Sequence, residues 1–315
     1  MTGAEAVGID VGGTKTAAAR VGANGAVLAY TSRPTPADDM AATLATMVEV
    51  ARDVLSDDVM GIGVAAAGLV ERTSGVLRFA PNLAWRNAPL VSHMHDVLGL
   101  PVVADNDNTA AAWGEFRFGA GRGRRDMLLV GVGTGIGGGI VADGRLVRGA
   151  HGFAAEIGHI VMDPDGPVCG CGNRGCWEQF ASGQAVTRGG RRAVEQGAAG
   201  SLAERSGGDP SRVDGPMVTE AATAGDAVSR AILSGVGEWL GVGIAGLVNI
   251  LDPELVVVTG GVASAGDLVL DPARAAFRRT VEAVDHRPEV PIVPGALGAH
   301  TGVVGAAALI LDEPA

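Results

Sequence analysis

Two segments about 120 residues apart in this 315-residue chain follow the same plan. In Ala6–Tyr30 and again in Met127–Val147, an apolar run enters a glycine-rich loop, and a second apolar run then reaches a tight turn. The turns are Asn24-Gly25 and Asp143-Gly144, and both are strong signals for a β-hairpin. Each segment therefore predicts a strand, a glycine loop and a hairpin, and the repetition favours a duplicated α/β unit.

The two glycine loops suit phosphate binding. Without side chains, successive backbone N–H groups can approach phosphate oxygens closely, and Thr14 and Thr134 add hydroxyl donors. Asp10 ends the first strand, where a carboxylate can hold magnesium or its water shell. Plain tight turns would explain one such loop, whereas two matched loops favour nucleotide binding. The predicted nucleotide-binding residues are Asp10, Gly12, Gly13, Thr14, Lys15, Gly133, Thr134, Gly135 and Gly137, with Gly260 and Gly261 at the end of a buried strand.

The second loop contains the GxGxxG spacing of dinucleotide-binding folds, in residues 133–138. That fingerprint requires a helix after the loop, with the pyrophosphate at the helix N-terminus. Here an apolar, β-type run and an Asp-Gly turn follow instead. We therefore predict no dinucleotide-binding fold. Residues 196–217 are rich in Gly, Ser, Asp and Pro and predict a mobile surface loop or a helix connection with no function of its own.

All three cysteines of the chain lie within eight positions, ten residues after His159. With that imidazole, Cys169, Cys171 and Cys176 form a complete tetrahedral ligand set for structural zinc, and the glycines between the cysteines allow a tight turn. Reduced, packed thiols are the alternative. A disulfide framework is disfavoured because the number of cysteines is odd.

A dense polar cluster follows the apolar run that begins at Leu100. Asn106 and Asp107 could bind and deprotonate a hydroxyl group, as a carboxylate general base does, or could simply cap the helix that follows. Both interpretations remain open from this segment alone. Glu156 precedes His159 by three residues and Glu178 follows the last cysteine by two, so a metal that fixes the loop would also place two carboxylates suited to sugar hydroxyls.

Composition narrows the class of protein. A chain with 47% hydrophobic residues can bury a large core and predicts two domains. Its net charge of −11 disfavours nucleic acid or an anionic membrane as partner. The sequence suggests no signal peptide and no apolar run of the roughly 20 residues that a spanning helix needs, and Leu240–Leu251 predicts a buried core helix. Clustered free thiols favour a reducing cytoplasm.

Together these segments resemble the ROK family (repressors, open reading frames and sugar kinases). The resemblance spans nearly the whole chain, and the CxCGxxGCxE signature with an upstream Gly-His is its most specific part. It implies an α/β, two-domain actin/hexokinase-like (ribonuclease H-like) ATPase fold with two β-hairpin phosphate loops and a central cleft. The implied domains are a small one of residues 1–109, joined by the C-terminal helix 301–315, and a larger one of residues 110–300 with the zinc loop.

Within the family the chain is most similar to kinases that phosphorylate glucose at O6 with ATP and magnesium. The resemblance implies that Asp107 takes the proton from that hydroxyl and that His159 serves both zinc and sugar. It further implies a cytoplasmic homodimer or homotetramer. The implied sugar-binding residues are Gly68, Asn82, Asn106, Asp107, Glu156, His159 and Glu178.

Other acceptors and another role remain open. N-acetylglucosamine, N-acetylmannosamine, fructose or mannose could replace glucose, and polyphosphate could replace ATP. A sugar-sensing regulator is the non-enzyme alternative, which is disfavoured because only nine residues precede Asp10. Two positions depart from the usual family pattern, Asn108-Thr109 after the implied base and Ala155 where many members have glycine.

Overall fold

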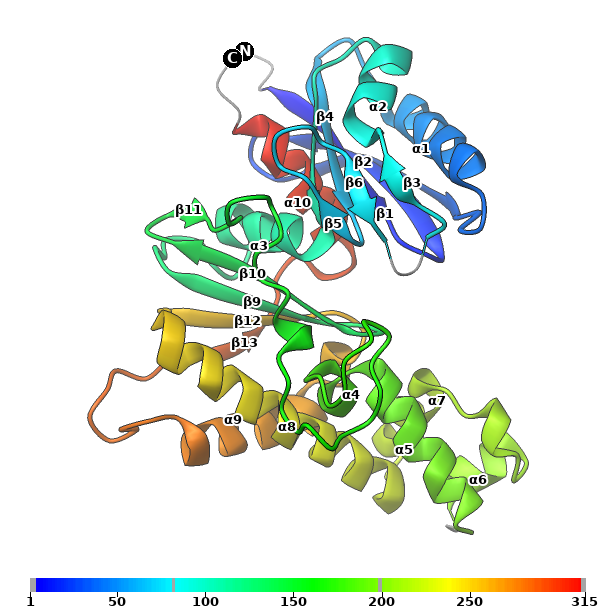
Figure 1. Ribbon diagram of the computed structural model, residues 1–315, viewed down its shortest axis with the longest axis vertical. Coiled ribbons are helices and arrows are strands. Elements are labelled where there is room, and N and C mark those ends of the chain that lie inside the picture. The colour runs from blue at the N-terminus through cyan, green and yellow to red at the C-terminus, as the bar shows by residue number, and fades with distance from the viewer. Residues whose placement is uncertain (1–3, 81–82, 198–199, 313–315) are drawn as a thin grey trace. The chain divides into compact units, whose positions relative to one another are not determined.

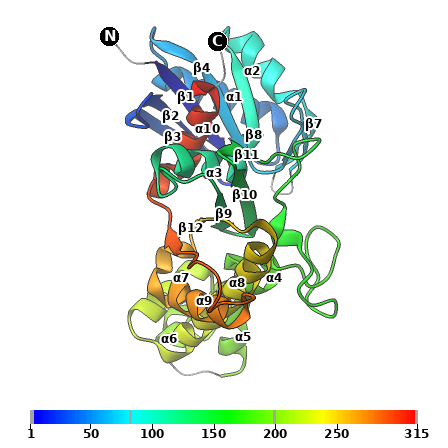
Figure 2. The same ribbon diagram turned by 90° about the vertical axis from the view of Figure 1, so that its left-hand side faces the viewer.

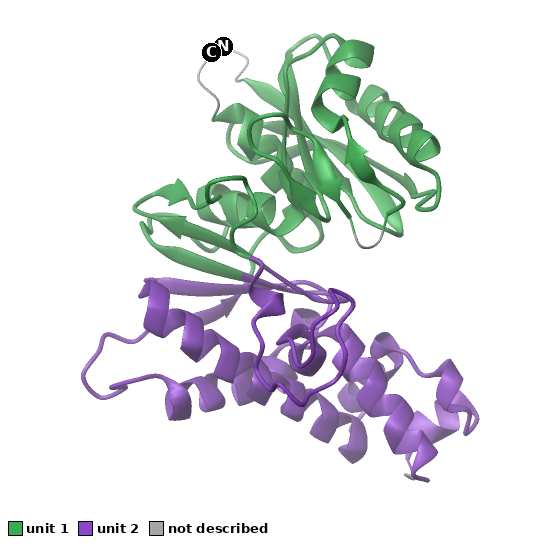
Figure 3. Ribbon diagram, viewed as in Figure 1, with its two compact units in different colours: residues 1–129, 138–155, 295–315 green, residues 130–137, 156–294 purple. Residues whose placement is uncertain are grey.

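The computed structural model describes residues 4–80, 83–197 and 200–312. The chain forms two compact units, shown in green and purple in Figure 3. Unit 1 comprises residues 1–129, 138–155 and 295–315, and unit 2 comprises residues 130–137 and 156–294. The domains predicted from the sequence, 1–109 with 301–315 and 110–300, have different bounds and stay a prediction.

Unit 1 is built on a five-stranded sheet in the order β3-β2-β1-β4-β8. Its strands are β1 (Glu5–Val11), β2 (Lys15–Gly22), β3 (Val27–Pro34), β4 (Val59–Ala66) and β8 (Val102–Asn106). The first three strands are antiparallel, as the predicted hairpin at Asn24-Gly25 requires, whereas β4 pairs in parallel with both β1 and β8. The carboxyl ends of β1, β4 and β8 therefore lie at one edge of the sheet, where polar residues follow β8.

Helices cover both faces of this sheet. Helix α1 (Met40–Val54) packs on one face with α2 (Leu90–Leu98) beside it. Helix α10 (Thr301–Leu311) lies against β1, β2 and β4, and α3 (Asp107–Phe118) packs next to it (Figure 1, Figure 2). The backbone of α10 lies so close to β1 and β4 that there is no room for a Cβ atom at Gly8 in β1 or at Gly63 in β4. The C-terminal helix predicted from the sequence is thus confirmed. A small sheet of β5 (Leu69–Val70), β6 (Leu77–Phe79) and β7 (Arg86–Ala88) completes the unit.

A second five-stranded sheet has the order β11-β10-β9-β12-β13. Its strands are β9 (Met127–Val132), β10 (Ile136–Ala142), β11 (Arg145–Leu146), β12 (Leu255–Thr259) and β13 (Ile292–Pro294). Asp143 and Gly144 both have positive φ, 51° and 74°, as a two-residue hairpin turn of the primed type requires. Strand β10 follows the second glycine loop directly, so the prediction of a hairpin instead of a dinucleotide-binding helix is confirmed.

The remaining helices belong to unit 2. They are α4 (Glu178–Ala181), α5 (Gly183–Glu195), α6 (Ser201–Ser206), α7 (Gly215–Thr223), α8 (Ala227–Leu251) and α9 (Asp267–Thr280), with short 3₁₀ turns at Ile157–His159, Pro210–Arg212 and Ala263–Ala265, and one at Gly298–His300 in unit 1. Of the two predictions for residues 196–217, the mobile loop is wrong and the helix connection is confirmed, because α6 and the start of α7 lie within this segment. Aspartate side chains cap these short elements: Asp209 and Asp214 accept from the amides of Ser211 and Met217.

Helix α8 is longer than the sequence pattern indicates. It extends to 25 residues and, within the described part of the chain, is the one helix long and apolar enough to cross a membrane by length and composition. The expectation that no run approaches this length is therefore wrong. Two charged residues, Arg230 and Glu238, interrupt its N-terminal half and hide its length in the sequence. In its most apolar window 56% of the residues are buried, and α8 packs against α9, α7, α5 and α4, as a core helix does.

Candidate active site

The first glycine loop places the Asp10 carboxylate at the edge of the unit 1 sheet. Asp10 lies near the end of β1, and the Gly12 amide donates to the Lys15 carbonyl oxygen at 3.0 Å, which closes the turn into β2. The Asp10 carboxylate contacts the first turn of α10 so closely that Gly302 has no space for a Cβ atom. A helix N-terminus stabilises negative charge, which offsets part of the cost of burying this carboxylate.

Asn106 and Asp107 lie at the junction of β8 and α3. The Asn106 side chain is the N-cap of α3, because its Oδ1 accepts from the Asn108 and Thr109 amides at 2.8 and 3.1 Å. Its Nδ2 donates to the carbonyl oxygen of Gly68 at 3.2 Å. The capping interpretation therefore holds for Asn106 but not for Asp107, which starts the helix and accepts from Asn108 Nδ2 at 3.1 Å.

The two carboxyl groups of this acidic site, Asp10 and Asp107, have perturbed ionisation. Burial, followed by the nearby charge of Asp107, raises the pKa of Asp10 to about 6, while Lys15 opposes the shift. Burial also raises the pKa of Asp107, against the hydrogen bonds from Asn108. A carboxylate whose proton affinity is raised is a better general base near neutral pH than an exposed aspartate.

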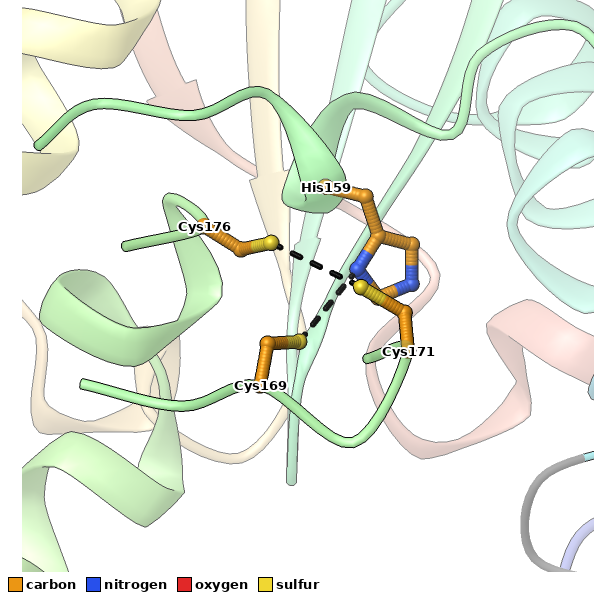
Figure 4. A group of neighbouring side chains, drawn as sticks. All are labelled: His159, Cys169, Cys171 and Cys176. Carbon is orange, nitrogen blue, oxygen red and sulfur yellow. Dashed lines mark hydrogen bonds between the residues drawn. The ribbon is translucent and has the colours of Figure 1, made fainter. Parts of the chain in front are cut away.

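The cysteine site of unit 2 comprises His159, Cys169, Cys171 and Cys176, whose ligand atoms all lie within 4.8 Å of one another. Figure 4 shows the three sulfur atoms and the His159 ring turned toward one centre. Cys169 Sγ lies 3.6 Å from His159 Nδ1, and Cys171 Sγ lies 3.6 Å from Cys176 Sγ. Ligands of a tetrahedral zinc ion are about 3.6–3.8 Å apart. The cluster therefore fits zinc and could bind it.

Backbone turns and one tryptophan hold the cysteine loop. Gly172 and Gly175 have positive φ, 96° and 65°, and the carbonyl of Asp163 excludes any Cβ at Gly175. Trp177 is fully buried, and its Nε1 donates to the Trp239 carbonyl in α8 at 2.8 Å. The loop that carries three ligands is thus anchored to the core of unit 2 at its last cysteine.

Two carboxylates adjoin the cysteine site, as the sequence predicts for a fixed loop. Glu156 Oε2 lies 3.9 Å from Nε2 of His159, which is the ring nitrogen that faces away from Cys169. Glu178 Oε1 lies 3.0 Å from Cys169 Sγ, and its other oxygen lies where a side chain on Gly135 would be. Glu178 therefore contacts both the cysteine site and the second glycine loop.

The second glycine loop is held from α5. The Gly183 and Gln184 amides donate to the carbonyl oxygens of Gly133 and Thr134 at 2.8 and 3.3 Å. Gly260, with φ of 94°, packs directly on the backbone of Val132 at the end of β9. Unit 2 thus brings together the loop at Gly133–Gly135 and the Gly260-Gly261 pair that the sequence singles out.

A cavity of about 1310 Å³ opens beside this loop, entirely within unit 2. Thr134 and Gly261 line it, as the nucleotide prediction expects, but most of its walls come from α5 and α7. Sequence reasoning missed those residues because no glycine motif marks them; the only signal is the Asp-Gly-Pro start of α7. The lining includes Gly183, Gln184, Thr187, Arg188, Arg191, Arg192, Asp214, Gly215, Pro216, Thr219 and Ser264.

The other predicted site residues have the following positions. Gly68, with φ of 145°, lies against Ala80 and next to Asn106, whereas Asn82 lies outside the described residues. Thr14 and Lys15 are exposed, and Lys15 Nζ lies 3.4 Å from the Tyr30 hydroxyl. Ala155, one of the two positions that the sequence analysis sets apart from the usual family pattern, has a left-handed φ of 68°. The structure brings the predicted residues together in two groups, one in each unit.

The paired sheets, the two glycine loops and the acidic site define an α/β actin-like sugar-kinase fold, as the sequence predicts. The ROK family model matches residues 6–313. The glucokinase of Streptomyces coelicolor is 41% identical over 312 residues, covering 96% of both chains. The ROK family glucokinase of Streptomyces griseus, solved with glucose and AMPPNP, is 40% identical, with a TM-score of 0.87 over 97% of this chain and 98% of that one.

The chain therefore belongs to the ROK family, and it is a hexose kinase by its relatives and fold. The same comparison includes a regulator. The xylose repressor of Caldicellulosiruptor bescii is 39% identical over 219 residues, which cover 69% of this chain and 54% of the repressor. Family membership alone thus leaves the role of the site to be argued from its residues.

Proposed function

We propose that this protein is an ATP-dependent glucokinase that forms glucose 6-phosphate. The observation that carries the proposal is Asp107, a carboxyl group of raised pKa at the N-terminus of α3, next to a second carboxylate at the first glycine loop. The likeness to glucokinases over nearly the whole chain supports glucose as the acceptor.

In the proposed reaction, Asp107 accepts the proton of the 6-hydroxyl as O6 forms a bond to the γ-phosphorus of ATP. The bond from that phosphorus to the β,γ-bridging oxygen breaks, and ADP leaves with the electron pair. Positioning and charge stabilisation supply most of the rate enhancement in such transfers, and a positioned base adds to it. Asn106 keeps Asp107 in place because it caps the same helix.

For the nucleotide, we propose that the two glycine loops bind phosphates and that the cavity of unit 2 takes the adenosine. The cavity meets Gly133, Thr134 and Gly261, and its 1310 Å³ is ample for a nucleoside. Oxygen donors with perturbed pKa at Asp10 and Asp107 fit magnesium, which would neutralise phosphate charge when bound.

For the sugar, we propose that Glu156 and Glu178 accept hydrogen bonds from its hydroxyl groups, and that the other binding residues are Gly68, Asn82, Asn106 and His159. Zinc would have a structural role, because four protein ligands leave no open coordination position. His159 supports this assignment: Nδ1 faces the sulfur atoms, and Nε2 faces Glu156 and remains available for a hydroxyl. Zinc would thus orient a sugar-binding imidazole.

The test is ADP release by purified, zinc-loaded protein with magnesium-ATP and a panel of sugars: glucose, mannose, fructose, N-acetylglucosamine and N-acetylmannosamine. We expect the highest kcat/KM with glucose. Turnover with only an N-acetylated sugar would contradict glucose as the substrate, but the protein would still be a hexose kinase. Polyphosphate in place of ATP, run in parallel, tests the donor.

A sugar-sensing regulator is the second candidate, because a repressor relative matches 69% of the chain. Sugar binding without turnover for every acceptor and both donors would favour it over the kinase. We also infer a soluble cytoplasmic homo-oligomer from the family resemblance, and light scattering during gel filtration tests the oligomeric state.

A further inference from the structure

A loop of unit 1, residues 147–155, leads from β11 to Glu156 and is fastened to the rest of the unit at several points. The Arg72 amide donates to the His151 carbonyl oxygen at 3.1 Å, and within the loop itself the Ala154 amide donates to the Arg148 carbonyl oxygen at 3.2 Å. Gly152, with φ of 96°, packs so closely on Val70 that no Cβ fits there. The segment before Glu156 is therefore held by specific contacts and is not a free linker.

The strongest of these contacts is an ion pair between Arg148 and Asp105. Arg148 Nε donates to Asp105 Oδ2 at 2.5 Å, and the Asp105 residue is only 4% exposed. The other oxygen, Oδ1, accepts from the Asn106 amide at 2.9 Å. Both oxygens of one buried carboxylate are thus engaged, one by the loop and one by the backbone of the next residue.

This carboxylate immediately precedes the residues of the acidic site. Asn106 caps α3 with its Oδ1, and Asp107 is the first residue of that helix. Burial raises the pKa of Asp105, while Arg148 and, more weakly, Arg72 oppose that shift. Removing one member of a buried pair leaves the other charge uncompensated. Without Arg148, Asp105 would protonate or reorient, and the backbone at Asn106 would lose its fixed acceptor.

We propose that Arg148 is a positioning residue for phosphoryl transfer, acting through Asp105 on Asn106 and Asp107 and tying them to the loop that leads to Glu156. The inference rests on the proposed function, since it concerns the placement of the proposed base. The inference goes beyond the proposed function because neither Arg148 nor Asp105 is among the predicted site residues. A displaced base lowers turnover more than nucleotide affinity.

The experiment compares Arg148→Met with a matched control, Arg125→Met. Arg125 also pairs with an aspartate, Asp143, but that pair is about three-quarters exposed, so its loss changes little. We expect Arg148→Met to lower kcat with glucose about tenfold and to change the KM for ATP less than about twofold. Arg148→Lys, which retains the charge, recovers part of kcat. Wild-type kcat and KM in Arg148→Met overturn the proposal.

A double-mutant cycle tests whether the effect passes through Asp105. We expect Asp105→Asn with Arg148→Met to lower kcat no further than the more damaging single change, because both remove the same link. Additive losses contradict the link. Circular dichroism and thermal unfolding of each variant measure the folded fraction, so that kcat is expressed per folded molecule.

Amide hydrogen exchange measures how firmly Asn106 caps α3, and it does not require enzyme turnover. The amides of Asn108 and Thr109 donate to the Asn106 cap, so Arg148→Met should speed their exchange about tenfold while Arg125→Met leaves it unchanged. Unchanged exchange in Arg148→Met overturns the proposal even where kcat falls. If the wild-type protein phosphorylates no sugar, the proposed function fails, and this exchange still decides the role of Arg148.

Discussion

The acidic site of unit 1 and the cysteine site of unit 2 are held in place by different means. Asp10 and Asp107 lie at the ends of regular elements, one near the end of β1 and one at the start of α3. His159 and the three cysteines lie in residues 157–176, where the structure has only a 3₁₀ turn and isolated bridges. Secondary structure fixes the acidic site. The residues of the cysteine site have the spacing of tetrahedral zinc ligands, but they lie in a segment with little regular structure.

This difference has a physical cause. A sheet edge and a helix N-terminus fix backbone direction through many hydrogen bonds, and a helix N-terminus also stabilises a carboxylate. An irregular loop has few such bonds, and a bound zinc ion supplies the missing constraint in one step. We therefore expect the acidic site to keep its structure when zinc is removed, and the cysteine site to lose its structure.

The largest effect is expected from a change in the acidic site that removes the proton acceptor but keeps the local structure. In Asp107→Asn, the asparagine side chain has nearly the same shape as aspartate and can still begin α3, but it cannot accept the proton. The kcat with glucose should therefore fall by about 10² or more. Steady-state kinetics measures this, with circular dichroism and glucose binding as checks that the fold and sugar affinity remain. Near-normal kcat in this variant would rule out Asp107 as the base.

The next effect tests the metal dependence of the cysteine site. Cys171→Ser should lose bound zinc and raise the KM for glucose by at least about tenfold, because His159 and its neighbouring carboxylates lose their support. Zinc content by atomic absorption and glucose KM are measured together. The control is Asn173→Ala in the same loop, whose exposed side chain is not a ligand. If the KM for glucose is the same in zinc-free and zinc-loaded protein, the cysteine site does not depend on zinc and the expected difference between the two sites is wrong.

The pH dependence probes the acidic site alone. Because burial raises the pKa of Asp107 above that of an ordinary aspartate, its ionised fraction falls earlier as the pH is lowered, and kcat should fall on the acid side. Asp10, with a pKa of about 6, binds its proton more tightly in the folded than in the unfolded protein. Its ionisation therefore lowers the stability of the metal-free protein as the pH rises from about 4 to about 6.

Two measurements check these signs. A pH profile of kcat from pH 5 to 8 should show an acid limb, and a flat profile would contradict the raised pKa of Asp107. Urea unfolding at pH 7 without magnesium should show Asp10→Asn to be more stable than the wild type, by about 1–3 kcal/mol. Lower stability of that variant would show that the Asp10 charge is compensated in the fold.

The smallest effect concerns Ala155, the last residue of the loop 147–155 and the neighbour of Glu156. A left-handed φ of 68° costs alanine about 1 kcal/mol or more relative to glycine, while glycine loses more entropy on folding. Ala155→Gly should therefore change the free energy of unfolding by less than about 1 kcal/mol, toward greater stability. Thermal unfolding measures it, and a clear loss of stability would show that the alanine methyl group contributes packing.

Much of the fold and of the candidate site could be predicted from local sequence. The hairpins at Asn24-Gly25 and Asp143-Gly144 follow from turn chemistry, and the cysteine site follows from spacing alone, because four ligands within 18 residues can reach one ion. The strand before Gly260-Gly261 was likewise evident from its apolar run. The domain bounds and the roles of the individual site residues stay predictions.

The tertiary structure decided what depends on distant segments. The sequence left Asn106 and Asp107 open between capping and catalysis, and only the folded chain shows Asn106 as the cap, with Asp107 beside Asp10 at raised pKa. The folded chain also revealed the cavity of unit 2, whose walls come mostly from α5 and α7, and the Arg148–Asp105 pair, 43 residues apart. Local rules act over a few residues along the chain, whereas burial, electrostatic coupling and cavities arise from residues that only folding brings together.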